Sequence, residues 1–167
     1  MTVAPRVDLA VMGLGYVGLP LARAAARKGL TVVGYDVHAG LVAELAAGRS
    51  HVDDVTDADV SAMLAAGFRT TTHGEDLGAA AAVIICVPTP LGSDGAPDVR
   101  AVEAAAATVA AVLRPGMLVV LESTTYPGTT EELLRPVLEA TGLVVGQDVH
   151  LSGPIQPSAQ PPVGSPA

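Results

Sequence analysis

Apolar residues in this chain alternate between short uninterrupted runs and longer stretches with helical spacing. The runs have the length and β-branched content of buried strands, and they fall at residues 7–12, 31–35, 68–72, 81–88 and 117–121. Stretches typical of helices lie between and after them, at residues 16–28, 41–48, 57–67, 75–80, 99–113 and 129–140. Strands that alternate with helices at this spacing predict an α/β fold with a doubly wound parallel sheet and right-handed crossovers.

Two of the predicted helices are preceded by residues that typically cap a helix. Asp98 comes directly before the stretch at 99–113, where its carboxylate can accept a main-chain N–H of the first turn. Thr129 and Glu132 have the spacing of a capping box, which predicts that the last helix begins there.

A glycine-rich turn follows the first predicted strand. Gly13, Gly15 and Gly18 have the G-x-G-x-x-G spacing between a strand and a helix, which is the context that this motif requires. Gly13 permits the tight turn, Gly15 lets a pyrophosphate approach the main chain, and Gly18 lets the helix pack closely on the sheet. A tight turn used only for packing is the alternative, and the surrounding strand–helix–strand pattern disfavours it.

Asp36 follows the second strand, 18 residues after Gly18. A carboxylate at this place can accept hydrogen bonds from a ribose diol and would repel a 2′-phosphate. The free N–H groups and the positive end of the helix dipole would hold the pyrophosphate without a basic side chain. The unit is therefore expected to be a Rossmann-type fold that binds NAD in preference to NADP.

Composition narrows the classes of partner. The 167 residues have a net charge of −8, with 17 acids against 9 bases, so no basic face is expected to bind nucleic acid. No apolar run approaches the roughly 18 residues of a membrane span, and the first residues do not have the pattern of a signal peptide. We therefore expect no membrane partner and a cytoplasmic location. The oligomeric state is left open.

Several polar or reactive residues have a structural interpretation beside a functional one. His51, Asp53 and Asp54 lack a further ligand at suitable spacing, so a solvated turn is favoured and no metal site is predicted. Cys86 lies inside an apolar strand and is expected to be a buried, unreactive thiol. The hydroxyls of Ser123 and Thr125 either face the crevice at the end of the fifth strand or satisfy main-chain groups of the turn.

The last fifteen residues differ from the rest of the chain. GPIQPSAQPPVGSPA has no charge and five prolines, a composition typical of a tail or linker. The expected division is an NAD-binding domain at 1–152 followed by a proline-rich segment at 153–167 that is either disordered or translated out of frame.

Several segments resemble the amino-terminal NAD-binding domain of the UDP-glucose/GDP-mannose dehydrogenase family, in the order that this family has. Their sequences are most similar to the branch of the family that oxidises UDP-N-acetylhexosamines. They are GLGYVGLPLA at 13–22, GYD at 34–36, GRSHVDDV at 48–55, ICVPTPL at 85–91, PD at 97–98 and ESTTYPGTTEELLRPVLE at 122–139.

The resemblance implies an NAD-dependent oxidation of the C6 alcohol of a UDP-sugar to a uronic acid. It implies that Thr89 and Thr124 line the nicotinamide end of the cofactor site, and that Thr124 also helps to position the catalytic water. The implied contacts at the other end and along the pyrophosphate come from Gly13, Gly15, Tyr16, Val17, Gly18 and Asp36.

The resemblance stops at Ser152. The family continues there with a Ser-Pro-Glu-Arg segment, and its catalytic cysteine, lysine and asparagine belong to later domains, so a truncated chain without turnover of its own is expected. One hypothesis is that residues 153–167 are that segment translated out of frame. A stand-alone, non-catalytic NAD-binding module and a different Rossmann dehydrogenase, such as a hydroxy-acid enzyme, are the alternatives.

Overall fold

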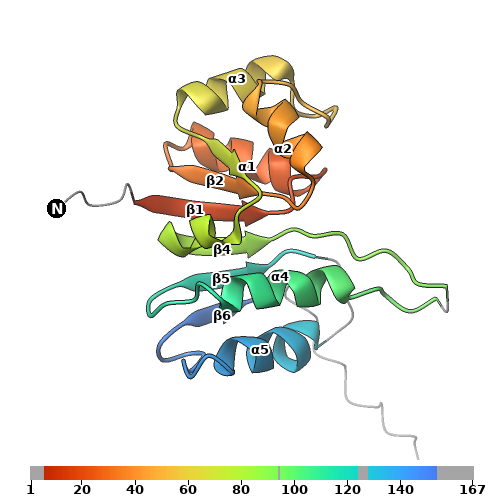
Figure 1. Cartoon of the computed structure of the whole chain (residues 1–167), viewed down its shortest axis with the longest axis vertical. Helices are drawn as coiled ribbons and strands as arrows, with labels where there is room; N and C mark the ends of the chain where they lie inside the picture. Colours follow the sequence, from red (N-terminus) through yellow and green to blue (C-terminus); the bar gives the residue numbers. More distant parts are fainter. Residues whose placement is uncertain (1–5, 94, 124–127, 154–167) are drawn as a thin grey trace, which may run out of the picture.

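The computed structural model describes residues 6–93, 95–123 and 128–153, and within them it contains one six-stranded parallel sheet (Figure 1). The strands are β1 Val7–Met12, β2 Val32–Tyr35, β3 Arg69–Thr71, β4 Ala80–Ile85, β5 Leu118–Leu121 and β6 His150–Ser152. The helices are α1 Gly18–Arg27, α2 Ala39–Ala46, α3 Asp57–Ala65, α4 Arg100–Ala110 and α5 Arg135–Glu139, with a 3₁₀ turn η1 at Gly74–Ala79 and a π turn η2 at Thr130–Leu134. The predicted doubly wound α/β fold is confirmed.

The order of the strands is β3-β2-β1-β4-β5-β6. The first three strands therefore extend the sheet to one side of β1, whereas β4, β5 and β6 extend it to the other side, and the topological switch point lies between β1 and β4. At such a switch point the loops after the two strands separate and leave a crevice at their carboxyl ends. The register brings four strand ends level, because Met12 pairs with Tyr35 on one side and Ile85 on the other, and Ile85 pairs with Leu121. The residues that directly follow these strands therefore lie along one edge of the sheet.

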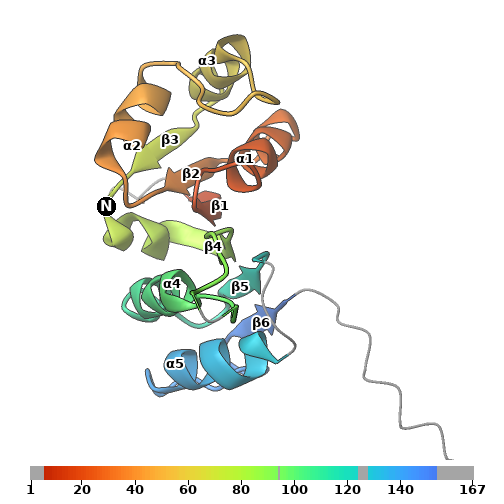
Figure 2. The same cartoon turned by 90° about the vertical axis from the view of Figure 1, so that its right-hand side faces the viewer.

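The sheet is buried on both faces along β1. Ala10 and Met12 join a core cluster with α4 and α5, whereas Leu9 and Val11 join a second cluster with α1 and α3. Figure 2 shows α1 on one side of the strands and α4 and α5 on the other. Each fully buried Leu, Met or Val side chain contributes roughly 1.5–3 kcal/mol. This is why β1 reads as a nearly continuous apolar run.

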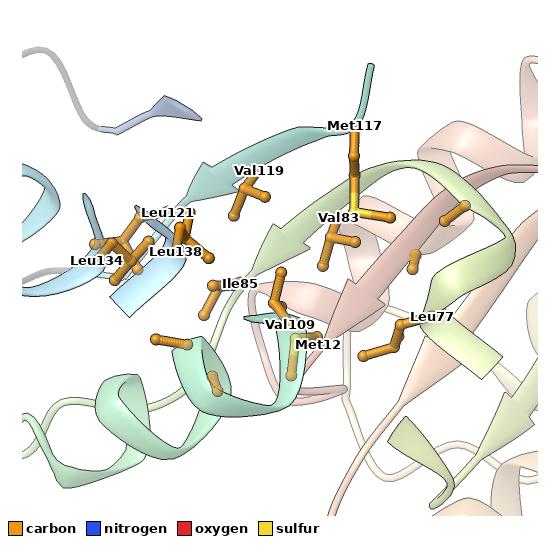
Figure 3. Packing of buried hydrophobic residues seen from close by; sticks show 14 of the residues in the cluster. Met12, Leu77, Val83, Ile85, Val109, Met117, Val119, Leu121, Leu134 and Leu138 are labelled. Carbon is orange, nitrogen blue, oxygen red and sulfur yellow. The ribbon is translucent and has the colours of Figure 1, made fainter. Parts of the chain in front are cut away.

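The cluster on the side of α4 and α5 joins the second half of the chain to β1. Figure 3 shows Ile85 of β4, Leu121 of β5 and Val109 of α4 directed into it together with Met12. All four side chains are buried, with exposed fractions of 1% or less. This packing holds α4 against the strands whose carboxyl ends form the crevice.

The structure differs from the sequence-based expectation at the starts of two helices. The capping box predicted at Thr129 is wrong, because Thr129 already has helical dihedral angles and makes no capping bond with its side chain. The main-chain N–H of Glu132 donates instead to the carbonyl of Gly128 at 2.8 Å. A capping box is formed at Thr56, whose hydroxyl accepts the N–H of Asp59 while the Asp59 carboxylate accepts the N–H of Thr56, each at 3.1 Å.

Asp98 acts close to the way predicted. Its carboxylate accepts the main-chain N–H of Arg100, the first residue of α4, at 3.1 Å, and it also pairs with the Arg100 guanidinium. That pairing lowers the pKa of Asp98 to about 2, because the guanidinium and the N–H stabilise the carboxylate.

The sixth strand, His150–Ser152, was not predicted from the pattern of apolar residues, since it has only three residues and only one of them is apolar.

Candidate dinucleotide site

A cleft of about 660 Å³ lies at the switch point, at the carboxyl ends of β1, β2, β4 and β5. Its floor is made by residues that directly follow these strands, and one wall is made by α4. The residues that line it are Met12, Gly13, Gly15, Tyr16, Val17, Tyr35, Asp36, Val37, His38, Leu41, His51, Cys86, Val87, Pro88, Thr89, Ala101, Ala104, Ala105, Thr108, Glu122 and Ser123.

Most residues of the predicted cofactor site meet at this cleft. Gly13, Gly15, Tyr16, Val17, Asp36 and Thr89 line it. Gly18 lies at the first position of α1, behind the glycine-rich turn, and does not line the cleft. Thr124 and Thr125 lie outside the described residues, so their predicted roles stay predictions.

The three glycines of the turn have three different surroundings. Gly13 has a φ of +86°, and a Cβ atom there would lie 2.7 Å from the carbonyl oxygen of Cys86. A Cβ atom on Gly18 would lie only 1.7 Å from the carbonyl oxygen of Gly13. A Cβ atom on Gly15, in contrast, would meet no protein atom within 4 Å. The first and third glycines therefore shape the turn, whereas the second keeps space free beside the main chain.

The amino end of α1 offers unpaired hydrogen-bond donors to the cleft. Within the described part of the chain, the N–H groups of Gly15, Tyr16 and Val17 donate to no protein acceptor. The first turn of α1 has no acidic side chain that would neutralise the positive end of the helix dipole. Tyr16 and Val17 are 71% and 57% exposed. These features make the amino end of α1 suitable for an anionic group.

Asp36 lies buried at the end of β2, with an exposed fraction of 8%. One carboxylate oxygen accepts the main-chain N–H of Leu14 at 2.9 Å, and the other accepts the N–H of His38 and contacts Nδ1 of its ring, both at 3.0 Å. Burial alone would raise the pKa of Asp36, but the hydrogen bonds from Leu14 and His38 and the nearby imidazole outweigh burial and lower it. The carboxylate is therefore ionised at neutral pH.

The far end of the cleft lies over β4 and β5. Cys86 is buried there, as expected, and burial together with the negative charge of Glu122 raises its pKa to about 12. The hydroxyl of Ser123 donates to the carbonyl of Val87 at 2.7 Å. Ser123 therefore lines the cleft and also satisfies a main-chain group, although that group belongs to the segment after β4 and not to its own turn. This bond ties the end of β5 to the segment that leads to Thr89.

Several lining residues were not identified from the sequence. His38 lies two residues after Asp36, and its position beside a predicted ribose-binding acid was the signal that could have revealed it. Glu122 directly follows β5 and could have been found from that place alone. The wall formed by α4 consists of residues 101, 104, 105 and 108. Their small side chains have the spacing of one helix face, and from the sequence alone this pattern predicts only ordinary packing against the sheet.

The lining contains the carboxylates of Asp36 and Glu122 but no lysine or arginine among the described residues. An anionic ligand would therefore be held by main-chain N–H groups rather than by basic side chains. His51 lines the cleft, but the described residues contain no group of three or more His, Cys, Asp or Glu side chains placed to hold a metal ion.

Among the same described residues, no helix is both long and apolar enough to cross a bilayer.

A parallel sheet with this strand order, a glycine-rich turn at the switch point and an acid at the end of β2 together define a Rossmann-type dinucleotide-binding domain. The chain belongs to the UDP-glucose/GDP-mannose dehydrogenase family, because the NAD binding domain of that family matches residues 7–152. NAD is therefore the cofactor of this domain.

Two relatives show how much of such proteins this chain represents. It is 40% identical over 146 residues to the UDP-N-acetyl-D-mannosamine dehydrogenase of Pyrococcus horikoshii, a match that covers 86% of this chain and 35% of that protein. It is 40% identical over 144 residues to the UDP-N-acetyl-D-glucosamine 6-dehydrogenase of Pseudomonas aeruginosa, covering 85% of this chain and 33% of the relative. The chain thus spans about a third of the length of these relatives.

Solved structures agree with this assignment. The chain superposes on the Pyrococcus horikoshii UDP-D-ManNAc dehydrogenase with a TM-score of 0.82 and 38% identity, covering 90% of this chain and 37% of the other. It superposes on a ternary complex of the Pseudomonas aeruginosa GDP-mannose dehydrogenase with a TM-score of 0.82 and 25% identity, covering 87% of this chain and 35% of that one.

Proposed function

We propose that the cleft holds NAD in one orientation and that residues 1–152 are the cofactor-binding part of a nucleotide-sugar dehydrogenase. The observation that supports this most directly is the open space at Gly15 beside the unpaired N–H groups of the α1 amino end. A pyrophosphate needs both features, because it must approach the main chain closely and must find donors there. Gly13 and Gly18 would keep the turn in the shape that exposes these donors.

The remaining contacts follow from the two ends of the cleft. Asp36 would accept a hydrogen bond from the adenosine ribose hydroxyls through Oδ2, which has a second lone pair beside the one that accepts the Leu14 N–H. The nicotinamide end would lie over β4 and β5, near Thr89 and above Cys86. When bound there, NAD supplies a hydride acceptor. The exposed Tyr16 and Val17 would cover the pyrophosphate from the solvent side.

The substrate and the complete reaction belong to the proposal as well. The names of the relatives support a UDP-N-acetylhexosamine as the substrate and its position 6 as the site of oxidation, and we propose that the C6 alcohol is oxidised to a uronic acid. Thr124 remains our candidate for the residue that positions the catalytic water. We further propose a cytoplasmic location, where the single Cys86 stays reduced, and a tail or linker in the proline-rich segment at 153–167.

A calorimetric titration of the purified chain with NAD and NADP at neutral pH tests the cofactor site. NAD should bind, and NADP should bind at least about tenfold more weakly, because a 2′-phosphate would meet the ionised Asp36 without a basic residue in the lining. Equal affinities would contradict the place that we give to Asp36.

A second measurement tests the separation of binding from turnover. The chain is incubated with NAD and with UDP-N-acetylhexosamines, and NADH is followed by its absorbance. We expect binding without NADH formation, because positioning a substrate against the cofactor can contribute about 7 kcal/mol or more and this chain has only one buried cysteine. Steady turnover by the 167-residue chain would refute the proposal that the domain needs further parts.

A further inference from the structure

We infer that Asp36 is also a positioning residue for the pyrophosphate, because its carboxylate holds the glycine-rich turn through the main chain of Leu14. This inference rests on the proposed NAD site and adds a second task to a residue whose proposed contact is with the ribose. The contact joins two parts of the site that are 22 residues apart in the sequence.

The geometry of the contact is that of a strong, buried hydrogen bond. The N–H of Leu14 donates to Oδ2 of Asp36 at 2.9 Å, and Asp36 is 8% exposed. The Leu14 side chain is fully buried in the core, so this residue is fixed on both its main-chain and side-chain sides. The neighbouring N–H of Gly13 donates to the carbonyl of Tyr35 at 2.8 Å. The entry to the turn is thereby attached to the end of β2 by two successive donors.

Both carboxylate oxygens of Asp36 are used in this way. Oδ2 accepts from Leu14, while Oδ1 accepts from the N–H of His38 at 3.0 Å and lies 3.0 Å from its ring nitrogen. An asparagine has the same shape but only one acceptor oxygen, and its NH₂ group is a donor. An Asp36→Asn substitution must therefore leave without its acceptor either the buried N–H of Leu14 or the part-buried N–H of His38, and the loss at Leu14 is the costlier because water has less access there.

The position of Leu14 explains why this matters for an anion. Leu14 stands between Gly13, which makes the turn, and Gly15, where the unpaired N–H groups begin. Holding the Leu14 N–H at β2 fixes the residue directly before Gly15, Tyr16 and Val17, which line the cleft and whose N–H groups have no acceptor in the described part of the chain. Asp36 thus supports the pyrophosphate site without touching the pyrophosphate, and recognition of the ribose and of the phosphates becomes one structural unit.

The chain contains a matched control at the opposite end of the same pair of strands. There the Asp8 carboxylate accepts the main-chain N–H of Thr31 at 2.9 Å, across 23 residues, and Asp8 does not line the cleft. Asp8 accepts only this main-chain N–H among the described residues, so an asparagine can still provide the acceptor. Asp8→Asn removes the same charge from a part-buried contact outside the cofactor site, where the carboxylate also lies 3.9 Å from Nε of Arg6.

Amide hydrogen exchange of the NAD-free chain, followed by NMR, tests the contact itself. In the wild type the Leu14 amide should exchange at least about tenfold more slowly than the unpaired amides of Gly15 and Tyr16. This part requires no variant, so it remains decisive if Asp36→Asn does not fold. Equal exchange at the three amides would overturn the inference.

Ligand binding then separates the two tasks of Asp36. ADP and 2′,3′-dideoxy-ADP are titrated into the wild type, Asp36→Asn and Asp8→Asn. The dideoxy compound has no ribose hydroxyls for Asp36 to bind, so a role limited to the ribose predicts that Asp36→Asn and wild type bind it equally. We expect Asp36→Asn to bind it roughly tenfold more weakly, and Asp8→Asn to bind it like the wild type.

The outcomes distinguish the inference from the proposed function. Equal affinity of wild type and Asp36→Asn for 2′,3′-dideoxy-ADP would overturn the inference, as would an equal loss in both variants. If the wild type bound neither ADP nor NAD, the proposed function would fail, while the exchange rate of Leu14 would still decide whether Asp36 holds the turn.

Discussion

Gly18 approaches the carbonyl oxygen of Gly13 so closely that a Cβ atom on Gly18 would stand 1.7 Å from it. The same atom would lie 3.2 Å from the side chain of Val11. The obstacle is main chain rather than the end of a flexible side chain, so the turn or the first residues of α1 would have to move. This contact explains why the third glycine of the motif is needed, although it does not line the cleft.

We expect Gly18→Ala to lower the free energy of unfolding by at least about 2 kcal/mol, because the methyl group cannot be accommodated without moving the main chain. Gly40→Ala is the control, since Gly40 lies in α2 and a Cβ atom there meets nothing within 4 Å. The control should leave stability unchanged or raise it by up to about 1 kcal/mol. Urea denaturation of both variants provides the measurement. An unchanged midpoint for Gly18→Ala would show that the contact is not restrictive.

Gly15→Val should have the opposite pattern, in which the fold is kept and the cofactor is lost. Its φ is not in the left-handed region and its Cβ direction is open, so the substitution should change the free energy of unfolding by less than about 1 kcal/mol. The isopropyl group would fill the space that we assign to the pyrophosphate. Calorimetry should detect no NAD binding to a variant whose circular dichroism spectrum matches the wild type. Retained NAD affinity would place the pyrophosphate elsewhere.

The stability conferred by Asp36 should disappear in acid. Its folded-state pKa lies below the ordinary value of 3.8, so the folded protein binds this proton less readily than the unfolded chain does. The stabilisation is therefore present in full above about pH 4 and is lost as the pH falls through the lower, folded-state pKa. We expect wild type to exceed Asp36→Asn by about 2 kcal/mol at neutral pH, on the scale of a buried hydrogen bond to a charged group.

Denaturation of wild type and Asp36→Asn at several pH values between about 2 and 7 measures this difference. It should stay constant down to about pH 4 and then decrease. Asp8→Asn, which keeps its acceptor for Thr31, serves as the control for removal of a carboxylate at the other end of the strands. A difference between wild type and Asp36→Asn that persists unchanged to the lowest pH would mean that the carboxylate charge is not its source.

Cys86 should react slowly with thiol reagents in the folded protein. Burial and the charge of Glu122 raise its pKa to about 12, so almost no thiolate is present at neutral pH. Labelling kinetics in buffer and in denaturing urea provide the comparison, with fast labelling only in urea. Glu122→Gln should leave the native reaction slow, since burial is the larger cause. Rapid labelling of the native chain would identify Cys86 as a reactive thiol.

The sequence by itself determined the parts of the site that depend on neighbouring residues. Gly13, Gly15 and Gly18 lie within one turn, and their spacing between a strand and a helix is a local property that can be read along the chain. Asp36 was found because it ends the second strand of the same unit. The fold class followed for a similar reason, since a strand covered on both faces leaves a continuous apolar run such as that of β1.

The tertiary structure decided which distant residues meet. The order in which strands pair is set by packing of helices on both faces, and only this order brings Cys86 and Glu122 beside Gly13 and Asp36. The bond from Leu14 to Asp36 depends on a register that places the ends of β1 and β2 level, because a hydrogen bond requires its two atoms within about 3 Å. Spacing along a sequence predicts that a carboxylate stands at a strand end, but not which N–H it accepts there.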